Sequence, residues 1–352
     1  MTTATTKAID AIFAAGVAKG ASDVHLVANM PPIARVDGRL DPLEGFDVLK
    51  PEDVETLCYS ILNAEQKKAY VDERELDIGY EIHGLSRFRV NLLWERDYAG
   101  LVARVISRKI PSMEDLGMPP ITYDLCRLKQ GLVLVTGPTG MGKSTTLAAM
   151  IDLINKEQAV NIVTLEDPVE FIYEAKKSII KQRQLGSDML SFGQGMKHIL
   201  RQDPNVIMVG EMRDLETISS VITLAETGHL VLATLHTLNA SQTIDRIIDV
   251  FPPYQQNQVR LQISLFLRGI ISQQLVPAKN GGRAAAREVL INTPAVANLI
   301  RENKIAQIRT AIQTSAEDGM FTMDQNIKRL YLDGIVSEEV ALSFMANPND
   351  LK

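Results

Sequence analysis

The stretch GLVLVTGPTGMGKSTTLAAM, residues 131–150, decides the fold of this chain. A short apolar run is followed by a segment that satisfies the pattern G-x-x-x-x-G-K-[ST], and then by residues with helical spacing. The glycines allow backbone N–H groups to point inward around an anion, and the N-terminus of the next helix adds partial positive charge beneath phosphates. We therefore expect a buried strand, a phosphate-binding loop and a helix over residues 145–154.

Two side chains of this loop have defined chemistry. Lys143 supplies a full positive charge to the β and γ phosphates, and the Ser144 hydroxyl can ligate Mg²⁺. The alternative is a glycine-rich turn with an incidental lysine, but strand, loop and helix all agree with ATP and Mg²⁺ binding. The predicted nucleotide-binding residues are Gly137, Pro138, Thr139, Gly140, Met141, Gly142, Lys143, Ser144 and Thr145.

Three further apolar runs follow the loop and alternate with helical stretches. They are NIVTLEDP (161–168), NVIMVGE (205–211) and HLVLATLH (229–236). Short β-branched runs separated by helices predict an α/β domain whose parallel sheet is covered on both faces. After about residue 293 the chain is expected to be mostly helical. Ligands of such sheets bind at the carboxyl ends of the strands, so the residues there are the site candidates.

Carboxylates follow two of these runs. Glu211 ends VIMVGE, where it can hold Mg²⁺ together with Ser144. Glu166, Asp167 and Glu170 come just after another run, and three carboxylates in five residues would repel one another without a cation. A Mg²⁺-centred site accounts for this acidic stretch; the alternative is a solvated acidic loop.

Two histidines bracket the run LVLATL. His229 and His236 both lie at predicted strand ends in the nucleotide-binding half. Each is a candidate catalytic group, with a satisfied core or rim histidine as the alternative. The residues alone leave their roles open.

Residues 1–107 predict a smaller α+β domain, residues 108–118 a linker, and residues 119–352 the nucleotide-binding domain. We expect helices over residues 7–19 and 51–70, and a hairpin turn at Asp37-Gly38. Strands are expected over residues 87–94 and 101–107. The first strand would carry Arg87 and Arg89 on one polar face and the second Arg104, as a platform that stabilises developing negative charge or simply as a solvated face.

Composition limits the partners. The 352 residues carry a net charge of −6 and no arginine- or lysine-rich run, which argues against a nucleic-acid translocase. The two cysteines, Cys58 and Cys126, form no C-x-x-C pair, and we expect reduced thiols in a cytoplasmic protein. No apolar stretch approaches the roughly 20 residues of a membrane helix, so membrane association is expected only through a partner.

Four segments in register carry a family resemblance: GPTGMGKSTTLAAM, TLEDPVEF, VGEMRDLETI and AETGHLVLATLHT. The chain resembles the secretion ATPases of the type II and type IV pilus class over nearly its whole length. The resemblance implies a hexameric ring with ATP between subunits, a PAS-like N-terminal domain and a RecA-like C-terminal domain. It also implies roles for individual residues: Lys143 and Ser144 as the Walker A pair, Glu211 as the Walker B acid, Glu170 as general base or water-orienting residue, His229 and His236 as the "His box", and Arg87, Arg89 and Arg104 as arginines that reach the γ-phosphate.

Within this class the residues favour pilus retraction, the basis of twitching motility, over assembly. Residues 295–302, AVANLIRE, resemble a motif of pilus retraction ATPases, although Val296 and Ala297 depart from it and an ordinary amphipathic helix is the alternative. Two cysteines cannot form the tetracysteine zinc element of assembly relatives, and we expect no long N-terminal extension; both points favour retraction. Met141 replaces a serine usual in the loop, with little effect expected on binding.

The expected partners are an inner-membrane pilus platform protein, at the cytoplasmic face of that membrane, and a paralogous ATPase. The alternatives are an assembly ATPase of a pilus or type II secretion system, a nucleic-acid translocase, and a nucleotide-regulated binding module with negligible turnover. The presence of Lys143, Glu170 and Glu211 argues against the last of these.

Overall fold

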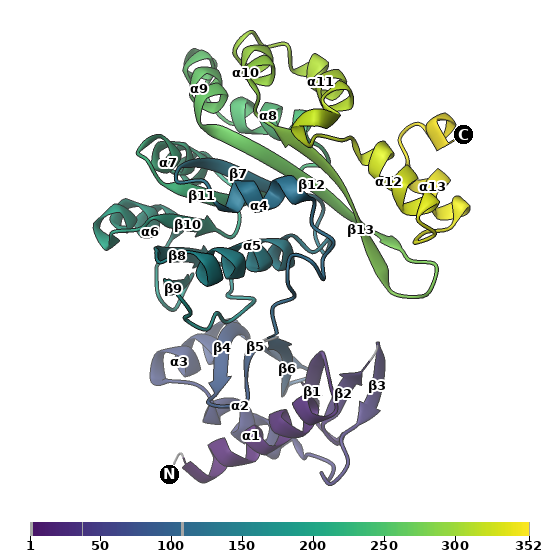
Figure 1. The fold of residues 1–352 in the computed structure, drawn as a ribbon. Helices are drawn as coiled ribbons and strands as arrows, with labels where there is room; N and C mark the ends of the chain where they lie inside the picture. The colour runs from purple at the N-terminus through teal and green to yellow at the C-terminus, as the bar shows by residue number, and fades with distance from the viewer. Residues whose placement is uncertain (1–2, 37, 107–108, 352) are drawn as a thin grey trace. The chain divides into compact units, whose positions relative to one another are not determined.

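A computed structural model of the protein describes residues 3–36, 38–106 and 109–351. The chain divides into two compact units: residues 1–109 with 170–172, and residues 110–169 with 173–352. Figure 1 traces the elements of both, and each unit is described by itself.

The first unit is a six-stranded antiparallel sheet with three helices (Figure 1). Its sheet order is β3-β2-β1-β6-β5-β4. The core is mainly aliphatic and includes an aromatic pair: Phe13 and Phe88 are fully buried, with ring centroids 4.7 Å apart. The elements are α1 (Thr3–Ala18), β1 (Asp23–Leu26), β2 (Ile33–Val36), β3 (Arg39–Pro42), α2 (Pro51–Ser60), α3 (Ala64–Glu73), β4 (Glu75–Ile82), β5 (Ser86–Glu95) and β6 (Tyr98–Ile106).

The expected hairpin is present, because β2 and β3 pair antiparallel around Gly38; Asp37, like Ser107 and Arg108, lies outside the described residues. The single helix expected over residues 51–70 is wrong. The chain forms two helices there, because Asn63 caps a new one: its side chain accepts from the Gln66 amide at 2.8 Å, and the Gln66 side chain accepts from the Asn63 amide at 3.0 Å.

The second unit contains a seven-stranded sheet of order β13-β12-β7-β11-β10-β8-β9. All neighbours pair parallel except β12 and β13, which form an antiparallel edge. The strands are β7 (Gly131–Thr136), β8 (Asn161–Glu166), β9 (Ile179–Gln184), β10 (Val206–Val209), β11 (Leu230–Leu235), β12 (Leu267–Pro277) and β13 (Arg283–Ile291).

Helices cover this sheet and continue to the C-terminus. The helices are α4 (Pro120–Cys126), α5 (Lys143–Glu157), α6 (Phe192–Ile199), α7 (Leu215–Glu226), α8 (Ala240–Asp249), α9 (Pro253–Phe266), α10 (Pro294–Arg301), α11 (Ile308–Thr314), α12 (Met323–Leu332) and α13 (Glu338–Phe344), with short 3-10 turns at Leu200–Gln202, Ile305–Gln307, Ala316–Asp318 and Pro348–Leu351. The predicted α/β class, with a parallel-sheet C-terminal domain after a smaller antiparallel one, is confirmed.

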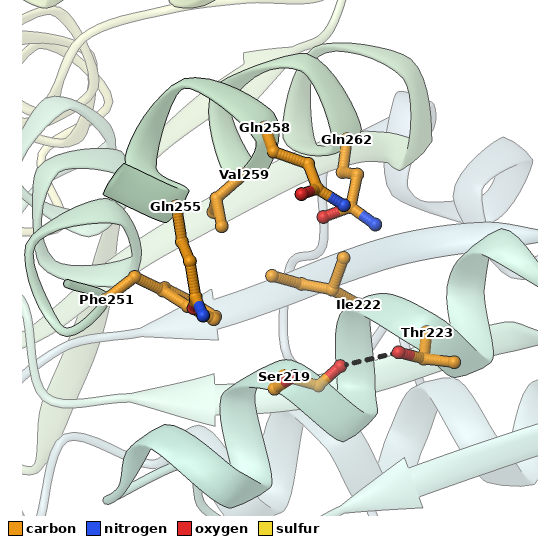
Figure 2. Close-up of a pocket in the computed structure, with 8 residues that line it drawn as sticks. All are labelled: Ser219, Ile222, Thr223, Phe251, Gln255, Gln258, Val259 and Gln262. Carbon is orange, nitrogen blue, oxygen red and sulfur yellow. Dashed lines mark hydrogen bonds between the residues drawn. The ribbon is translucent and has the colours of Figure 1, made fainter. Parts of the chain in front are cut away.

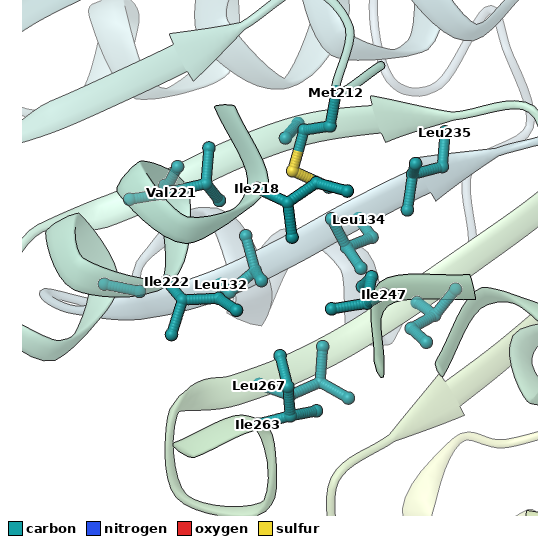
Figure 3. Close-up of a cluster of buried hydrophobic side chains, with 14 of the residues drawn as sticks. Leu132, Leu134, Met212, Ile218, Val221, Ile222, Leu235, Ile247, Ile263 and Leu267 are labelled. Atoms are coloured by element: carbon teal, nitrogen blue, oxygen red, sulfur yellow. The ribbon is translucent and has the colours of Figure 1, made fainter. Parts of the chain in front are cut away.

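Burial explains why β7 reads as a continuous apolar run. All six of its residues are buried, so both faces of the strand are covered. On one face, Leu132 and Leu134 pack in a cluster with side chains of α7, α8 and α9 (Figure 3). Helix α5 also packs against β7 and β11.

Three strands of this sheet, β9, β12 and β13, were not expected from the sequence. Polar residues interrupt their apolar pattern, as in SQQ within β12 and RAAARE within β13. Residues 110–118, expected as linker, group with the second unit. Arg287 of β13 donates hydrogen bonds there to the carbonyl oxygens of Leu116 (2.8 Å) and Gly117 (3.1 Å).

Candidate nucleotide-binding site

The loop of residues 137–144 lies at the carboxyl end of β7. That strand pairs with β11 on one side and β12 on the other, and the chain crosses from β7 through α5 to β8, beyond β11 and β10. Since these strands are parallel, the residues that follow β8, β10 and β11 emerge at the same edge of the sheet as the loop. Glu211 and His236 therefore come together with the loop.

The backbone of the loop requires its glycines. Gly137, Gly140 and Gly142 have φ of 144°, 78° and 79°, in the region that side chains disfavour. At Gly137 the space is closed as well, because an added Cβ would lie 2.2 Å from the carbonyl oxygen of Gln273. A loop of this conformation leaves room for an anion against its amides.

Lys143 is the first residue of α5, and only 8% of it is exposed. Its Nζ donates to the carbonyl oxygens of Gly137 (2.7 Å) and Pro138 (3.0 Å). The same Nζ lies 3.4 Å from Nδ1 of His236, and the Thr139 hydroxyl lies 3.3 Å from that nitrogen. These contacts hold the ammonium over the loop.

His236 connects the lysine to a carboxylate. An ammonium only donates, so Nδ1 of His236 accepts and its Nε2 carries the proton. Nε2 lies 2.7 Å from Glu211 Oε1, and the other oxygen of Glu211 lies 2.8 Å from an Arg213 guanidinium nitrogen. Lys143, His236, Glu211 and Arg213 thus form one connected chain of polar contacts.

Neighbouring side chains keep the Glu211 carboxyl in its ionised form. Burial acts to raise the pKa of its carboxyl, but the hydrogen bonds from Arg213 and His236 and the charge of Arg213 outweigh burial, and the pKa lies below its usual value. Glu211 is therefore ionised at neutral pH. The sequence patterns did not predict Arg213 as a site residue. The feature that could have indicated it is its place two residues after Glu211, in VGEMRD.

The acidic stretch after β8 does not form one cluster. Glu166 is buried and accepts hydrogen bonds from the Thr164 hydroxyl (2.7 Å) and the Gln182 amide (3.1 Å). Asp167 acts electrostatically on Arg213, and Glu170 groups with the first unit. In the described part of the chain, no group of three or more His, Cys, Asp or Glu side chains could hold a metal ion. Hydrogen-bond donors from the chain itself contact Glu166, and the Mg²⁺-centred site expected for this stretch stays a prediction.

His229 lies at the opposite edge of the sheet from the loop. It precedes β11, whereas His236 follows it, and a six-residue strand separates the two by about 20 Å. The Nδ1 of His229 is 3.1 Å from the carbonyl oxygen of Leu224 and 3.2 Å from the Thr227 hydroxyl. Within one subunit His229 therefore stabilises the turn between α7 and β11, and a catalytic role for it stays a prediction.

The two histidines make a matched test. We expect His236→Ala to lower ATP turnover about 10-fold or more, because it breaks the connection between Lys143 and Glu211. We expect His229→Ala to leave the ATP affinity of isolated subunits unchanged. Calorimetry and phosphate-release assays on both variants check this; a loss of ATP affinity in isolated subunits of His229→Ala would contradict the separation of His229 from the loop.

The three arginines lie on neighbouring strands of the first unit. Phe88, Val90 and Leu92 are buried, which confirms the predicted alternation along β5. Arg89 lies opposite Arg104 of β6 in the antiparallel strand register. Nε of Arg104 lies 2.8 Å from Asp23 Oδ1.

Arg87 packs over β4. A Cβ added at Gly79 would lie 2.9 Å from its guanidinium, so Gly79 provides the space that this side chain occupies. The action of the three arginines on a phosphate remains a prediction.

A groove between α7 and α9 is separate from the loop (Figure 2). Its volume is about 270 Å³, and its side chains are hydroxyls, amides and apolar groups, with no ionisable group among them to act as an acid or base. They belong to Ser219, Ile222, Thr223, Phe251, Gln255, Gln258, Val259 and Gln262. No helix in the described ranges has the length and apolar character needed to span a bilayer.

The parallel sheet, the phosphate loop and the polar chain from Lys143 to Arg213 define a P-loop ATPase. The profile of the family described as "Type II/IV secretion system protein" matches residues 2–281. The chain belongs to this family.

Two pilus ATPases and one solved structure match this chain over most of their length. The chain is 46% identical over 333 residues to the type IV pilus retraction ATPase PilT of Pseudomonas aeruginosa, covering 95% of this chain and 96% of that one. It is 41% identical to the type IV pilus ATPase PilU of the same organism, covering 96% and 88%. A crystal structure of the pilus retraction motor PilT with bound ADP superimposes with a TM-score of 0.91 at 42% identity, over 97% of both chains.

Proposed function

We propose that this chain is a motor ATPase that couples ATP hydrolysis to retraction of a type IV pilus, as a hexameric ring with nucleotide between subunits. One observation carries the proposal: near full-length similarity to PilT, in a chain whose P-loop, Glu211 and His236 meet at one edge of the sheet. A nucleic-acid translocase would need a basic stripe, and the net charge of −6 does not favour one.

Hydrolysis requires Mg²⁺ and a water-activating group in addition to the loop. The Ser144 hydroxyl, in the second residue of α5, and the Glu211 carboxylate, after β10, are oxygen donors at the same edge of the sheet, a donor set that suits Mg²⁺ with phosphates and water. When bound, the ion neutralises charge on the β and γ phosphates. Lys143 holds the same phosphates, and Glu170 orients or deprotonates the attacking water.

The N-terminal domain, residues 1–107, contributes the remaining positive charge from a neighbouring subunit. Arg87, Arg89 and Arg104 would reach the γ-phosphate there and stabilise the charge that develops during transfer. The ion pair with the buried Asp23 supports this role for Arg104, because it restricts the side chain to one orientation before ATP arrives.

We expect Arg104→Ala to reduce hydrolysis by assembled rings about 100-fold or more, since arginines that act across subunits contribute effects of this order. ATP affinity of isolated subunits should stay unchanged, because the arginine belongs to the other subunit's site. Phosphate release measured across a dilution series of protein checks the first statement, and calorimetry with ATP below the assembly concentration checks the second.

Arg127→Ala is the matched control for Arg104→Ala. Arg127 is also an exposed arginine paired with a carboxylate, at 2.9 Å from Glu157, but it follows α4 in the second unit. It should leave turnover unchanged. If turnover per subunit proves independent of protein concentration far below assembly, the trans-acting role is refuted.

The proposed site of work is the cytoplasmic face of the inner membrane, on a pilus platform protein and together with a PilU-type paralogue. Deletion of the gene in its native host tests the direction of work. Excess pili without twitching motility, restored by the wild-type gene and not by Lys143→Ala, supports retraction. Cells without pili would instead show an assembly ATPase and overturn the proposal.

A further inference from the structure

The end of β12 runs alongside the phosphate loop. β12 pairs parallel with β7, and Ser272 is the partner of Thr136, the last residue of β7. The Thr136 hydroxyl donates to the Ser272 hydroxyl at 2.8 Å. β12 continues to Pro277, so residues 273–275 extend past the end of β7 and lie beside the loop.

Gln273 contacts the loop at two of its glycines. Its backbone carbonyl oxygen is the atom that a Cβ on Gly137 would meet at 2.2 Å. Its side-chain Nε2 is the atom that a Cβ on Gly142 would meet at 3.3 Å. Gln273 of β12 therefore lies close to both Gly137 and Gly142 of the loop.

The side chain of Gln273 is 2% exposed and both ends of its amide are used. Nε2 donates to the carbonyl oxygen of Met141 at 2.6 Å, and Oε1 accepts from the hydroxyl of Thr146 in α5 at 2.8 Å. A carbonyl oxygen only accepts, so the bond to Met141 fixes which end of the amide faces the loop. One glutamine thus joins the middle of the loop to the first turns of the helix that follows it.

The bond to Met141 determines where the next amide points. In a trans peptide the C=O of Met141 and the N–H of Gly142 point in opposite directions. Turning the carbonyl toward Gln273 directs the Gly142 N–H away from β12, toward the inside of the loop. Amides with this orientation are what the loop offers to phosphate oxygens.

The side chain of Met141 adds a second contact to the same strand. Its sulfur accepts from the backbone N–H of Leu275 at 3.2 Å. The residue at this variable position of the loop is therefore anchored to β12.

We propose that Gln273 is a positioning residue that holds the phosphate loop in its anion-binding conformation and so sets the affinity for ATP. This inference rests on nucleotide binding by the loop, which is part of the proposed function, and is independent of pilus retraction.

The test compares the ATP affinity of purified full-length variants by calorimetry with Mg²⁺ present. Gln273→Leu leaves the Met141 carbonyl and the Thr146 hydroxyl without their partner, and we expect about 10-fold weaker binding. Gln274→Leu is the matched control, because strand alternation places Gln274 on the opposite face of β12. It should bind ATP as the wild type does.

Two further measurements separate positioning from a loss of stability. In steady-state assays Gln273→Leu should raise KM more than it lowers kcat, and thermal unfolding without nucleotide should show that the variant is folded at the assay temperature. Thr146→Val should weaken binding while Thr146→Ser, which keeps the hydroxyl, should restore it; this pair decides the matter if Gln273→Leu does not fold.

Equal ATP affinity for Gln273→Leu and Gln274→Leu, or for Thr146→Val and Thr146→Ser, would overturn the inference and leave the proposed function untouched. A wild-type protein that binds no ATP would refute both. A failure of the pilus phenotype in the native host would refute only the proposed function.

Discussion

Lys143→Ala is expected to abolish ATP binding and hydrolysis. The ammonium is nearly buried at the start of α5 and held by two carbonyl oxygens of the loop, so no other cation can take its position. Charge-assisted hydrogen bonds to phosphate are among the strongest in proteins, and losing two of them weakens affinity about 100-fold or more. Calorimetry with Mg²⁺ and ATP, together with phosphate release, measures the loss.

Lys156→Ala controls for the loss of a lysine from the same helix. Lys156 lies at the other end of α5, half exposed and paired with Asp152 at 2.7 Å. The Lys156→Ala variant should bind and hydrolyse ATP like the wild type. Normal ATP affinity in Lys143→Ala would contradict the assignment of residues 137–144 as the phosphate loop.

Glu211→Gln is expected to stop turnover while ATP still binds. The substitution keeps the size of the side chain and removes the charge that His236 and Arg213 stabilise and that would hold Mg²⁺. Binding depends mainly on the loop and Lys143, so affinity should change little. Removing one electrostatic stabiliser of a transition state costs about 10²- to 10³-fold in kcat, and single-turnover hydrolysis measures it.

Glu216→Gln is the control for this carboxylate. Glu216 lies five residues further on, in α7, and its exposed side chain pairs with Lys197 at 3.4 Å. Its loss should leave turnover unchanged. If Glu211→Gln hydrolyses ATP as fast as Glu216→Gln does, Glu211 is not the acid of the metal site.

The parts of the fold that could be predicted depend on residues that lie close together in the sequence. Each of the four central strands is a buried apolar run between turn residues, and such runs identify themselves without tertiary information. β12 and β13 carry Gln273, Arg287 and Glu288 in buried positions, so their pattern is not apolar. Only their tertiary partners offset the free-energy cost of burying these polar groups, and those partners are distant in sequence.

The site shows the same division. Lys143 and Ser144 could be assigned from spacing, because the loop is a local structure with its own backbone requirements. His229 and His236 look equivalent in the sequence, yet they lie at opposite ends of β11 and only His236 contacts Lys143. The direction of β11 within the sheet decides which of the two histidines lies at the loop.

By itself the sequence determined the phosphate loop, the class of fold and the family, because glycine geometry and apolar runs act over a few neighbouring residues. Only the tertiary structure decided that His236 contacts Lys143 and that Gln273 lies against the loop. Strand order places β11 and β12 beside β7, and side chains 136 positions apart in sequence, as for Thr136 and Ser272, then meet within hydrogen-bonding distance.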